Sequence, residues 1–277
     1  MTGEAVKLRF ALIGGDRRSC ELAWLLEEDG HHVRSFASEE KSPRCVGCLQ
    51  GCIYGAEAVV LPVPTLRDGT INAPLSREQI TVGELTAALW PGQHVFGADA
   101  QLKDSAEAAG AIYHSIPGLP GFQEHNSALT AEGALELMIH NSPRSIAGSA
   151  VLITGSGALS AALVPRLRAL GALVTVCARR GGDMDFRALA EHPGKYDFVV
   201  NTVPARVLPQ SGLRPAGPDA LYLELASPPG GIAPGEAEKL GLRPLSAPGL
   251  PGKTAPLSAA MFLREAIYNV LEVGYGQ

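Results

Sequence analysis

The chain has 277 residues, of which 46% are hydrophobic and 18% are charged, and its formal net charge is −5. This composition is typical of a globular protein with one large domain or two ordinary ones, and it argues against a nucleic-acid-binding protein, which would carry a basic domain or stripe. No run of roughly 18 apolar residues predicts a membrane span, and the first residues, MTGEAVKLRF, lack the apolar segment of a signal peptide. We therefore expect a soluble, cytoplasmic protein without membrane or nucleic-acid partners.

Alternating strands and helices are predicted in the first half of the chain. Gly14 and Gly15 separate the first strand from the first helix, because a tight turn needs residues that accept unusual backbone angles. The charges that follow, on Asp16 and Arg18, leave this turn open as either a site for a small anion or a plain surface turn. Apolar runs predict strands at 8–13, 31–36, 56–64, 93–98 and 108–116, and helical spacing predicts helices at 19–29 and 78–90.

A connecting helix is predicted in the middle of the chain, and a second α/β pattern follows it. The helix is expected over 127–142, after the proline- and glycine-rich residues 115–122. The last segment, 255–273, is amphipathic, with Leu263 and Ile267 on its apolar face, and should bury that face against the first half. Between these two segments we expect a helix at 158–170 and strands at 150–154, 173–178, 196–202, 220–225 and 242–246.

The element order predicts an α/β fold of two Rossmann-like, doubly wound domains with mostly parallel sheets. Residues 1–125 would form a domain for substrate or partner, and residues 126–256 a nucleotide-binding domain that includes the linking helix. Residues 257–277 would form a C-terminal helix that returns to the first domain. Only one of the two glycine turns needs to bind a nucleotide.

Three of the five cysteines, Cys45, Cys48 and Cys52, lie close together in the sequence. A CxxC pair can place two thiolates on a metal ion, but no second pair and no histidine at zinc-like spacing accompanies it. We therefore expect no metal site and a loop with reduced thiols. An odd number of cysteines fits a reducing compartment better than a disulfide framework.

The second glycine turn has the sequence GSGALS (155–160) and lies between a predicted strand and a predicted helix, as a dinucleotide site requires. Gly155 would permit the tight turn, and Gly157 would let the backbone approach a pyrophosphate at the helix N-terminus. Ser160 is small enough to stand where a third glycine is usual. The alternative is a turn with a structural role only.

The strand after this helix ends at two arginines, Arg179 and Arg180. A site for NAD usually has an acidic residue here, which accepts a hydrogen bond from the ribose 2′-hydroxyl. Arginine instead offers cationic donors to a 2′-phosphate, so the sequence favours NADP over NAD. Two alternatives stay open: a solvated surface pair, and Asp183 or Asp185 as ribose acceptors.

Three further loops follow predicted strands, where open α/β sheets place their ligands: 201–204 (NTVP), 226–231 (ASPPGG) and 247–256 (APGLPGKTAP). The third is too rich in glycine and proline to be expected as a helix. Together the loops predict a ligand cleft. The candidate acids and bases are His114, His125, Glu132 and Lys253.

Several segments, in order along nearly the whole chain, resemble the family of dipicolinate synthase A subunits from spore-forming bacteria. They are IGGDRR, VVLPVP, LTAEGALELMIH, ITGSGALSAAL, NTVPARVL, LELASPPGGI and APGLPGKTAP. The last two, at their mutual spacing, are the most specific. The cysteine cluster is not part of the family pattern.

The resemblance implies a subunit that works during sporulation with a flavoprotein, the B subunit of the same synthase. Together they would convert the product of dihydrodipicolinate synthase, 4-hydroxy-tetrahydrodipicolinate, into dipicolinate with a nicotinamide cofactor. Two alternatives stay open: a stand-alone NADP-dependent dehydrogenase of a small hydroxy or keto acid, and a non-catalytic scaffold subunit that binds a nucleotide. Whether the chain also forms a homo-oligomer is left open.

The resemblance also suggests roles for individual residues. The NADP site would comprise Gly155, Ser156, Gly157, Ala158, Ser160, Arg179, Arg180, Thr202, Val203, Pro204 and Ala226. The catalytic candidates are Glu132, Asn201 and Ser227, with Glu132 as a general base or a positioning residue. The dicarboxylate substrate would be bound by Arg18, Thr130 and Gly133, at the N-terminus of the helix that carries Glu132.

Overall fold

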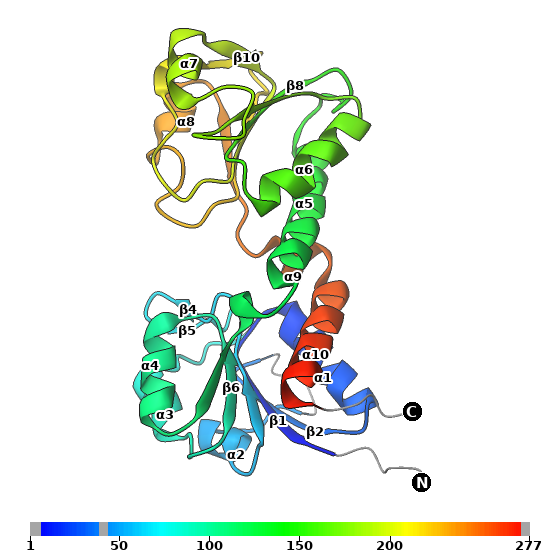
Figure 1. The fold of residues 1–277 in the computed structure, drawn as a ribbon, viewed down its shortest axis with the longest axis vertical. Coiled ribbons are helices and arrows are strands. Elements are labelled where there is room, and N and C mark those ends of the chain that lie inside the picture. The colour runs from blue at the N-terminus through cyan, green and yellow to red at the C-terminus, as the bar shows by residue number, and fades with distance from the viewer. Residues whose placement is uncertain (1–6, 39–43, 273–277) are drawn as a thin grey trace. The chain divides into compact units, whose positions relative to one another are not determined.

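The computed structural model describes residues 7–38 and 44–272. The chain divides into two compact units (Figure 1). Unit 1 comprises Met1–Gln123 and Ala255–Gln277, and unit 2 comprises Glu124–Thr254. The outermost parts of the domains predicted at 1–125 and 257–277 lie outside the described residues.

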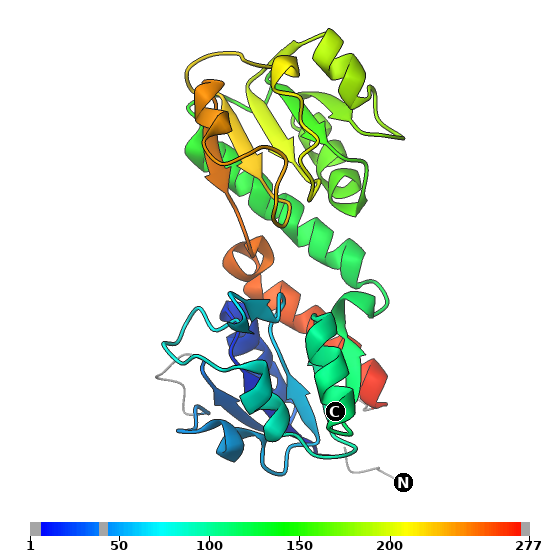
Figure 2. The same ribbon diagram turned by 90° about the vertical axis from the view of Figure 1, so that its left-hand side faces the viewer.

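Unit 1 is built on a five-stranded parallel sheet with the order β2-β1-β3-β6-β7. Figure 2 shows these strands, blue to green, side by side. Its strands are β1 (Arg9–Ile13), β2 (His32–Phe36), β3 (Ala58–Val60), β6 (His94–Gly97) and β7 (Ile112–Ser115). The helices are α1 (Arg17–Glu28), α2 (Leu49–Ile53), α3 (Val82–Ala87), α4 (Ala100–Ala108) and α10 (Pro256–Leu271), with a small hairpin of β4 (Leu66–Arg67) and β5 (Thr70–Ile71) and a 3-10 turn at Ile116–Gly118.

The C-terminal helix α10 packs against α1 in unit 1 (Figure 1), as the amphipathic pattern predicted. Leu263 and Ile267 are buried in one cluster with Leu22 and Leu26 of α1. The Tyr268 hydroxyl donates a hydrogen bond of 2.8 Å to Asp29 at the end of α1. The last helix of the chain therefore completes the core that the first strands begin.

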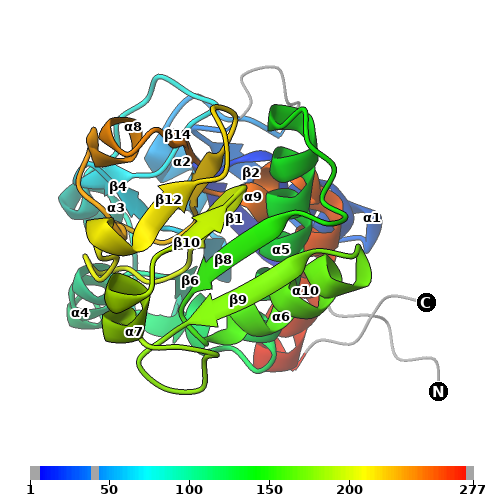
Figure 3. The same cartoon turned by 90° about the horizontal axis from the view of Figure 1, so that it is seen from above.

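Unit 2 repeats the architecture with a five-stranded parallel sheet in the order β14-β13-β11-β8-β9. Figure 3 shows β8 and β9 side by side in this sheet. The strands are β8 (Ala150–Thr154), β9 (Leu173–Cys177), β11 (Phe198–Asn201), β13 (Leu221–Glu224) and β14 (Arg243–Ser246), with a separate pair of β10 (Gly194–Tyr196) and β12 (Leu213–Pro215). The helices are α5 (Phe122–Asn141), whose first two residues belong to unit 1, α6 (Ala158–Ala169), α7 (Phe186–Glu191), α8 (Glu236–Lys239) and α9 (Leu250–Thr254), with a 3-10 turn at Gln210–Gly212.

The connecting helix α5 begins at Phe122, five residues before its predicted start, and this corrects one sequence-based expectation. Thr130, Glu132 and Gly133 were expected at the helix N-terminus, but they lie in its interior. Backbone amides in the interior of a helix donate to the carbonyl four residues earlier, so those of Thr130–Gly133 are not free for an anion.

Two other segments predicted as loops are helical. Residues 247–256 contain α9. Pro251 does not prevent this helix, because it is the second residue, where the backbone amide that proline lacks would have no acceptor within the helix. The burial of Leu250 favours the helix. The cysteine segment contains α2, in which Cys52 and Ile53 are buried and the Cys48 sulfur accepts a hydrogen bond from the Gly51 amide. In residues 247–256 the burial of Leu250 outweighed the glycine and proline signals for a loop, and in the cysteine segment the helix buries Cys52 and Ile53.

Two parallel sheets with alternating helices confirm the predicted α/β class. Within residues 7–38 and 44–272, no helix has the length and apolar character needed to cross a bilayer.

Candidate functional site

The turn after β8 requires glycine at position 155. Gly155 has φ of +90°, a conformation that side chains other than hydrogen disfavour. A Cβ there would lie 2.6 Å from the Thr202 Oγ1 atom, and the Gly155 amide donates to the Cys177 carbonyl at 2.8 Å. The turn after β8 therefore lies in contact with the carboxyl ends of β9 and β11.

Gly157 differs from Gly155, because space is open beside it. It is the N-cap of α6, no side chain caps that helix end, and no heavy atom lies within 4 Å of the position a Cβ would take. The first amides of a helix have no intrahelical acceptor and form a natural anion site. Ala158 is half-buried as the first residue of α6, and Ser160 is buried with its hydroxyl 3.2 Å from that of Thr202.

Arg179 and Arg180 are both exposed just after the end of β9. The Ser156 hydroxyl donates to the Arg180 carbonyl at 2.8 Å, which ties the arginine segment to the glycine turn. The two competing aspartates are engaged elsewhere: Asp183 accepts from the Val176 amide at 2.7 Å, and Asp185 caps α7 through the Ala188 amide. Both arginines are thus exposed in a segment that is hydrogen-bonded to the glycine turn.

Asn201, at the carboxyl end of β11, is fully buried, and its side-chain amide is saturated with hydrogen bonds. Its Oδ1 accepts from the Thr154 hydroxyl at 2.5 Å and from the Val203 amide at 3.2 Å. Its Nδ2 donates to the Val203 carbonyl at 2.9 Å and to Glu224 at 2.7 Å. A side-chain amide has about four hydrogen-bonding positions, so Asn201 has none left for a ligand in this arrangement.

Glu224, at the carboxyl end of β13, was not among the residues predicted from sequence. Its carboxylate accepts from Asn201, from the Tyr222 hydroxyl at 2.6 Å, and from the amides of Ala226 at 3.1 Å and Gly231 at 2.8 Å. Burial, reinforced by the Glu224 carboxylate, raises the pKa of the Tyr222 hydroxyl, which therefore remains a donor. The sequence held only a weak signal, which could not identify the residue: an acidic side chain at a strand end, six residues before the glycine pair of Gly230 and Gly231.

The other residues predicted to border the nicotinamide lie in the loops after β11 and β13. Pro204 and Ser227 are exposed, whereas Thr202, Val203 and Ala226 are half-buried. The Thr202 hydroxyl donates to the Thr154 carbonyl at 2.5 Å, which joins the β11 loop to β8. The carboxyl ends of β8, β11 and β13 are thus connected by hydrogen bonds and bear exposed side chains on the loops above them.

Of the predicted substrate residues, the two on α5 serve the packing of the helix. The Thr130 hydroxyl donates to the Asn126 carbonyl at 2.7 Å. Gly133 is buried, and a Cβ there would lie 2.9 Å from the Leu250 Cβ of α9. Glu132, on the same helix, is exposed with its carboxylate 3.9 Å from Arg166.

Arg18 belongs to unit 1, where its side chain is buried at the start of α1. Its guanidinium donates to both oxygens of Asp16, at 2.9 and 2.8 Å, and to the Val63 carbonyl at 2.5 Å. Asp16 also caps α1 through the Arg18 amide at 3.0 Å. These contacts join the first glycine turn to the loop after β3.

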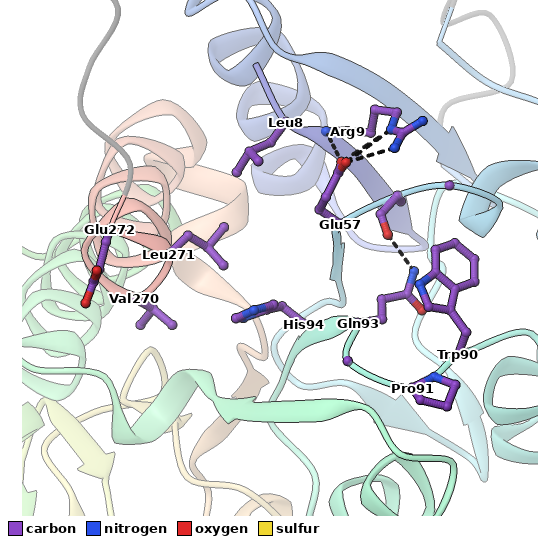
Figure 4. Close-up of a pocket in the computed structure, with 13 residues that line it drawn as sticks. Leu8, Arg9, Glu57, Trp90, Pro91, Gln93, His94, Val270, Leu271 and Glu272 are labelled. Atoms are coloured by element: carbon purple, nitrogen blue, oxygen red, sulfur yellow. Dashed lines mark hydrogen bonds and ion pairs between the residues drawn. The ribbon is translucent and has the colours of Figure 1, made fainter. Parts of the chain in front are cut away.

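A cavity of about 760 Å³ lies in unit 1 beside the amino ends of β1 and β6 (Figure 4). Its lining includes the ion pair of Arg9 and Glu57, the Trp90 indole and His94. Ligands of open α/β sheets bind at the carboxyl ends of the strands, which lie at the opposite edge. The cavity is therefore separate from the first glycine turn, at Gly14 and Gly15 after the carboxyl end of β1.

The other predicted acids and bases lie on different elements of the chain, His114 on β7 and Lys253 on α9. His114 lies 2.9 Å from His94 between ring nitrogens, and burial lowers the pKa of both. Lys253 is exposed on α9. In the described part of the chain, no three histidine, cysteine, aspartate or glutamate side chains are grouped so that they could hold a metal ion.

Comparison with known proteins agrees with the resemblance seen in the sequence motifs. Residues 9–115 match the family model that describes the N-terminal domain of the dipicolinate synthase A subunit. Over 284 residues the chain is 29% identical to the dipicolinate synthase A subunit of Bacillus subtilis, covering 95% of this chain and 96% of that protein. The resemblance to the A subunit of dipicolinate synthase is confirmed.

Solved structures of the dipicolinate synthase A subunit have the same fold. The Bacillus subtilis structure has a TM-score of 0.78 at 28% identity and covers 98% of both chains. The Bacillus halodurans structure has a TM-score of 0.80 at 23% identity, covering 98% of this chain and 100% of that one. The NAD⁺-bound 3-phosphoglycerate dehydrogenase of Entamoeba histolytica shares the fold at 13% identity, with a TM-score of 0.52 over 98% of both chains. The fold is thus Rossmann-like and of the dehydrogenase type.

Proposed function

We propose that the chain is the nicotinamide-dependent subunit of a dipicolinate synthase, acting in the cytoplasm of sporulating cells with a flavoprotein partner. The observation that carries the proposal is the open turn at Gly157, where the uncapped N-terminus of α6 meets a backbone position free of neighbouring side chains. The similarity to the dipicolinate synthase A subunit supports the substrate and the partner. The fold shared with a dehydrogenase that binds NAD⁺ supports the cofactor.

The cofactor is proposed to be NADP. Its pyrophosphate would lie on the α6 N-terminus beside Gly155 and Gly157, where amides and the helix dipole favour anions. Arg179 and Arg180 would bind the 2′-phosphate, because guanidinium groups match phosphate oxygens in charge and geometry. The nicotinamide would border the loops that carry Thr202, Val203, Pro204 and Ala226.

The reaction removes one water molecule and two hydrogens from 4-hydroxy-tetrahydrodipicolinate, and the ring becomes aromatic. A nicotinamide supplies the acceptor for one hydrogen and both electrons as a hydride, and the second hydrogen leaves as a proton. Ser227 and Glu132 are exposed polar side chains of unit 2, and we propose them for substrate contact and proton acceptance. Asn201 has a supporting role in this proposal, because all of its hydrogen bonds are made within the protein. They hold the loops after β11 and β13 that border the nicotinamide.

Titration of the purified chain with NADPH and with NADH, followed by nucleotide fluorescence, tests the cofactor. We expect NADPH to bind at least about tenfold more tightly than NADH, a difference of about 1.4 kcal/mol. Equal weak binding, or none, would contradict the proposal.

Reconstitution with the flavoprotein, followed by pyridine absorbance as each cofactor is added, tests the reaction. Dipicolinate should form only when both proteins and NADP are present. Full activity of the flavoprotein alone would make this chain a scaffold. Turnover of a hydroxy acid by this chain alone would make it a stand-alone dehydrogenase.

A further inference from the structure

We propose that Glu224 is the positioning residue of the nucleotide site: it holds the 226–231 loop and Asn201 in the geometry that the cofactor requires. This inference rests on the proposed function. Glu224 is half-buried at the end of β13, and four donors from three parts of unit 2 converge on its two oxygens. A carboxylate that accepts several hydrogen bonds fixes all of its donors at once.

The two oxygens have different tasks. Oε1 accepts from Asn201 Nδ2 and from the Ala226 amide, so it joins the end of β11 to the start of the loop after β13. Oε2 accepts from the Tyr222 hydroxyl and from the Gly231 amide, so it holds the far end of that loop. The loop is therefore clamped at both ends by one side chain, with exposed Ser227 between the clamped positions.

Glu224 also determines how Asn201 is oriented. An ionised carboxylate can only accept hydrogen bonds, so the NH₂ of Asn201 must face it and the Oδ1 must face away. In that orientation Oδ1 receives the Thr154 hydroxyl of β8 and the Val203 amide of the β11 loop. The charge on Glu224 thus sets the arrangement of three strand ends around the proposed nicotinamide.

The glycines of the loop allow this close approach. A Cβ at Gly230 would lie 2.6 Å from Glu224 Oε2, and a Cβ at Gly231 would lie 2.6 Å from Asn201 Cγ. Contacts below about 3 Å are not available to a carbon atom, so the loop backbone lies directly on the Asn201–Glu224 pair. The two consecutive glycines of this segment therefore have a packing role in the same clamp.

The decisive variant is Glu224→Gln, which keeps the size and removes one acceptor. Whichever way the new amide turns, its NH₂ faces a backbone donor. It should take the Oε2 position, where the Tyr222 hydroxyl can turn to accept, and the Gly231 amide then loses its partner. We expect hydrogen exchange in residues 226–231 to accelerate about tenfold without nucleotide present, and the Kd for NADPH to rise about tenfold.

Asp197→Asn is the matched control. Asp197 is a buried carboxylate of the same sheet, just before β11, and accepts from the Ala150 amide at 2.9 Å, but at the opposite end of the strand from Asn201. We expect it to lower the unfolding midpoint without changing loop exchange or the Kd for NADPH. If Glu224→Gln fails to fold, Gly231→Ala replaces it, because a methyl group there displaces Asn201 and should weaken NADPH binding similarly.

The outcomes separate the two proposals. Unchanged loop exchange in Glu224→Gln, an equal change in Asp197→Asn, or faster exchange with unaltered NADPH affinity would overturn the role of Glu224. Failure of the unaltered chain to bind NADPH would overturn the proposed function and the binding role together, while the exchange measurement would still show whether Glu224 holds the loop.

Discussion

Gly155 and Thr202 approach each other so closely that no side chain fits between them. The position of a Cβ on Gly155 lies 2.6 Å from the Thr202 hydroxyl oxygen, and the φ of Gly155 is +90°. Gly157, two residues later, has φ of −82° and nothing within 4 Å. The two glycines of one turn are therefore required for different reasons, one for folding and the other, in our proposal, for the ligand.

Gly155→Ala should destabilise unit 2 by about 2–3 kcal/mol, because it combines a left-handed backbone with a steric clash. Gly157→Ala should change the unfolding free energy by less than about 1 kcal/mol but weaken NADPH binding, since its methyl group would occupy the space proposed for the pyrophosphate. Urea unfolding and nucleotide titration of both variants provide the measurements. Equal loss of stability in the two variants would contradict the assignment.

Arg179→Ala and Arg180→Ala should weaken NADPH more than NADH, because only NADPH carries the 2′-phosphate. We expect a loss of about tenfold or more for NADPH in the double variant and little change for NADH. Arg187→Ala is the control, since this exposed arginine of the same unit pairs only locally, with Glu191 on α7. If the double variant weakened both nucleotides equally, the arginines would have no role in cofactor choice.

Stability should fall as the pH is lowered through the titration range of three histidines of unit 1. Burial lowers the pKa of His31, His94 and His114 in the folded chain. Below about pH 6.5 the unfolded chain therefore takes up protons that the folded chain resists, so the stabilisation is complete above that pH and is lost as the pH falls toward the lowered values. Urea unfolding midpoints between pH 7.5 and 5 measure how steeply stability falls with pH. This dependence should be shallower in the His94→Gln/His114→Gln variant. An unchanged dependence would show that other groups cause the loss of stability.

Cys48 should react with thiol reagents well before Cys52 or Cys177. Cys48 is exposed, whereas burial raises the pKa of Cys52 to about 12 and that of Cys177 to about 11, which keeps both as unreactive thiols. Alkylation with iodoacetamide, followed by peptide mass spectrometry, gives the order. Early labelling of Cys52 in the folded protein would contradict the burial of α2.

The sheets and the glycine turn could be predicted from sequence because their signals are local. Apolar runs that stop at glycine or proline mark strands such as β8, and a turn such as 155–160 is recognisable from its neighbours. The start of α5 was missed because Phe122 is buried by α10, a contact between segments far apart in the sequence. Helix α9 was missed because Leu250 is buried in a cluster with residues of α5, close to Gly133, more than a hundred residues earlier.

Glu224 could not be identified as important from sequence for a similar reason. A single acidic residue at a strand end is usually solvated, and its role here depends on four donors supplied by Tyr222, Asn201 and two loop amides. Asn201, in turn, was predicted as catalytic from its place after a strand and from the family resemblance, and its saturated hydrogen bonds became visible only in three dimensions.

The return of α10 to unit 1 has a consequence for synthesis on the ribosome. Domains commonly fold in the order in which they emerge, the first one earliest. Here the first strands of the chain must wait, with the apolar face of α1 uncovered, until residues 256–271 have been translated, whereas unit 2 is continuous and emerges whole before then. The nascent chain should therefore complete its second unit first and its first unit last.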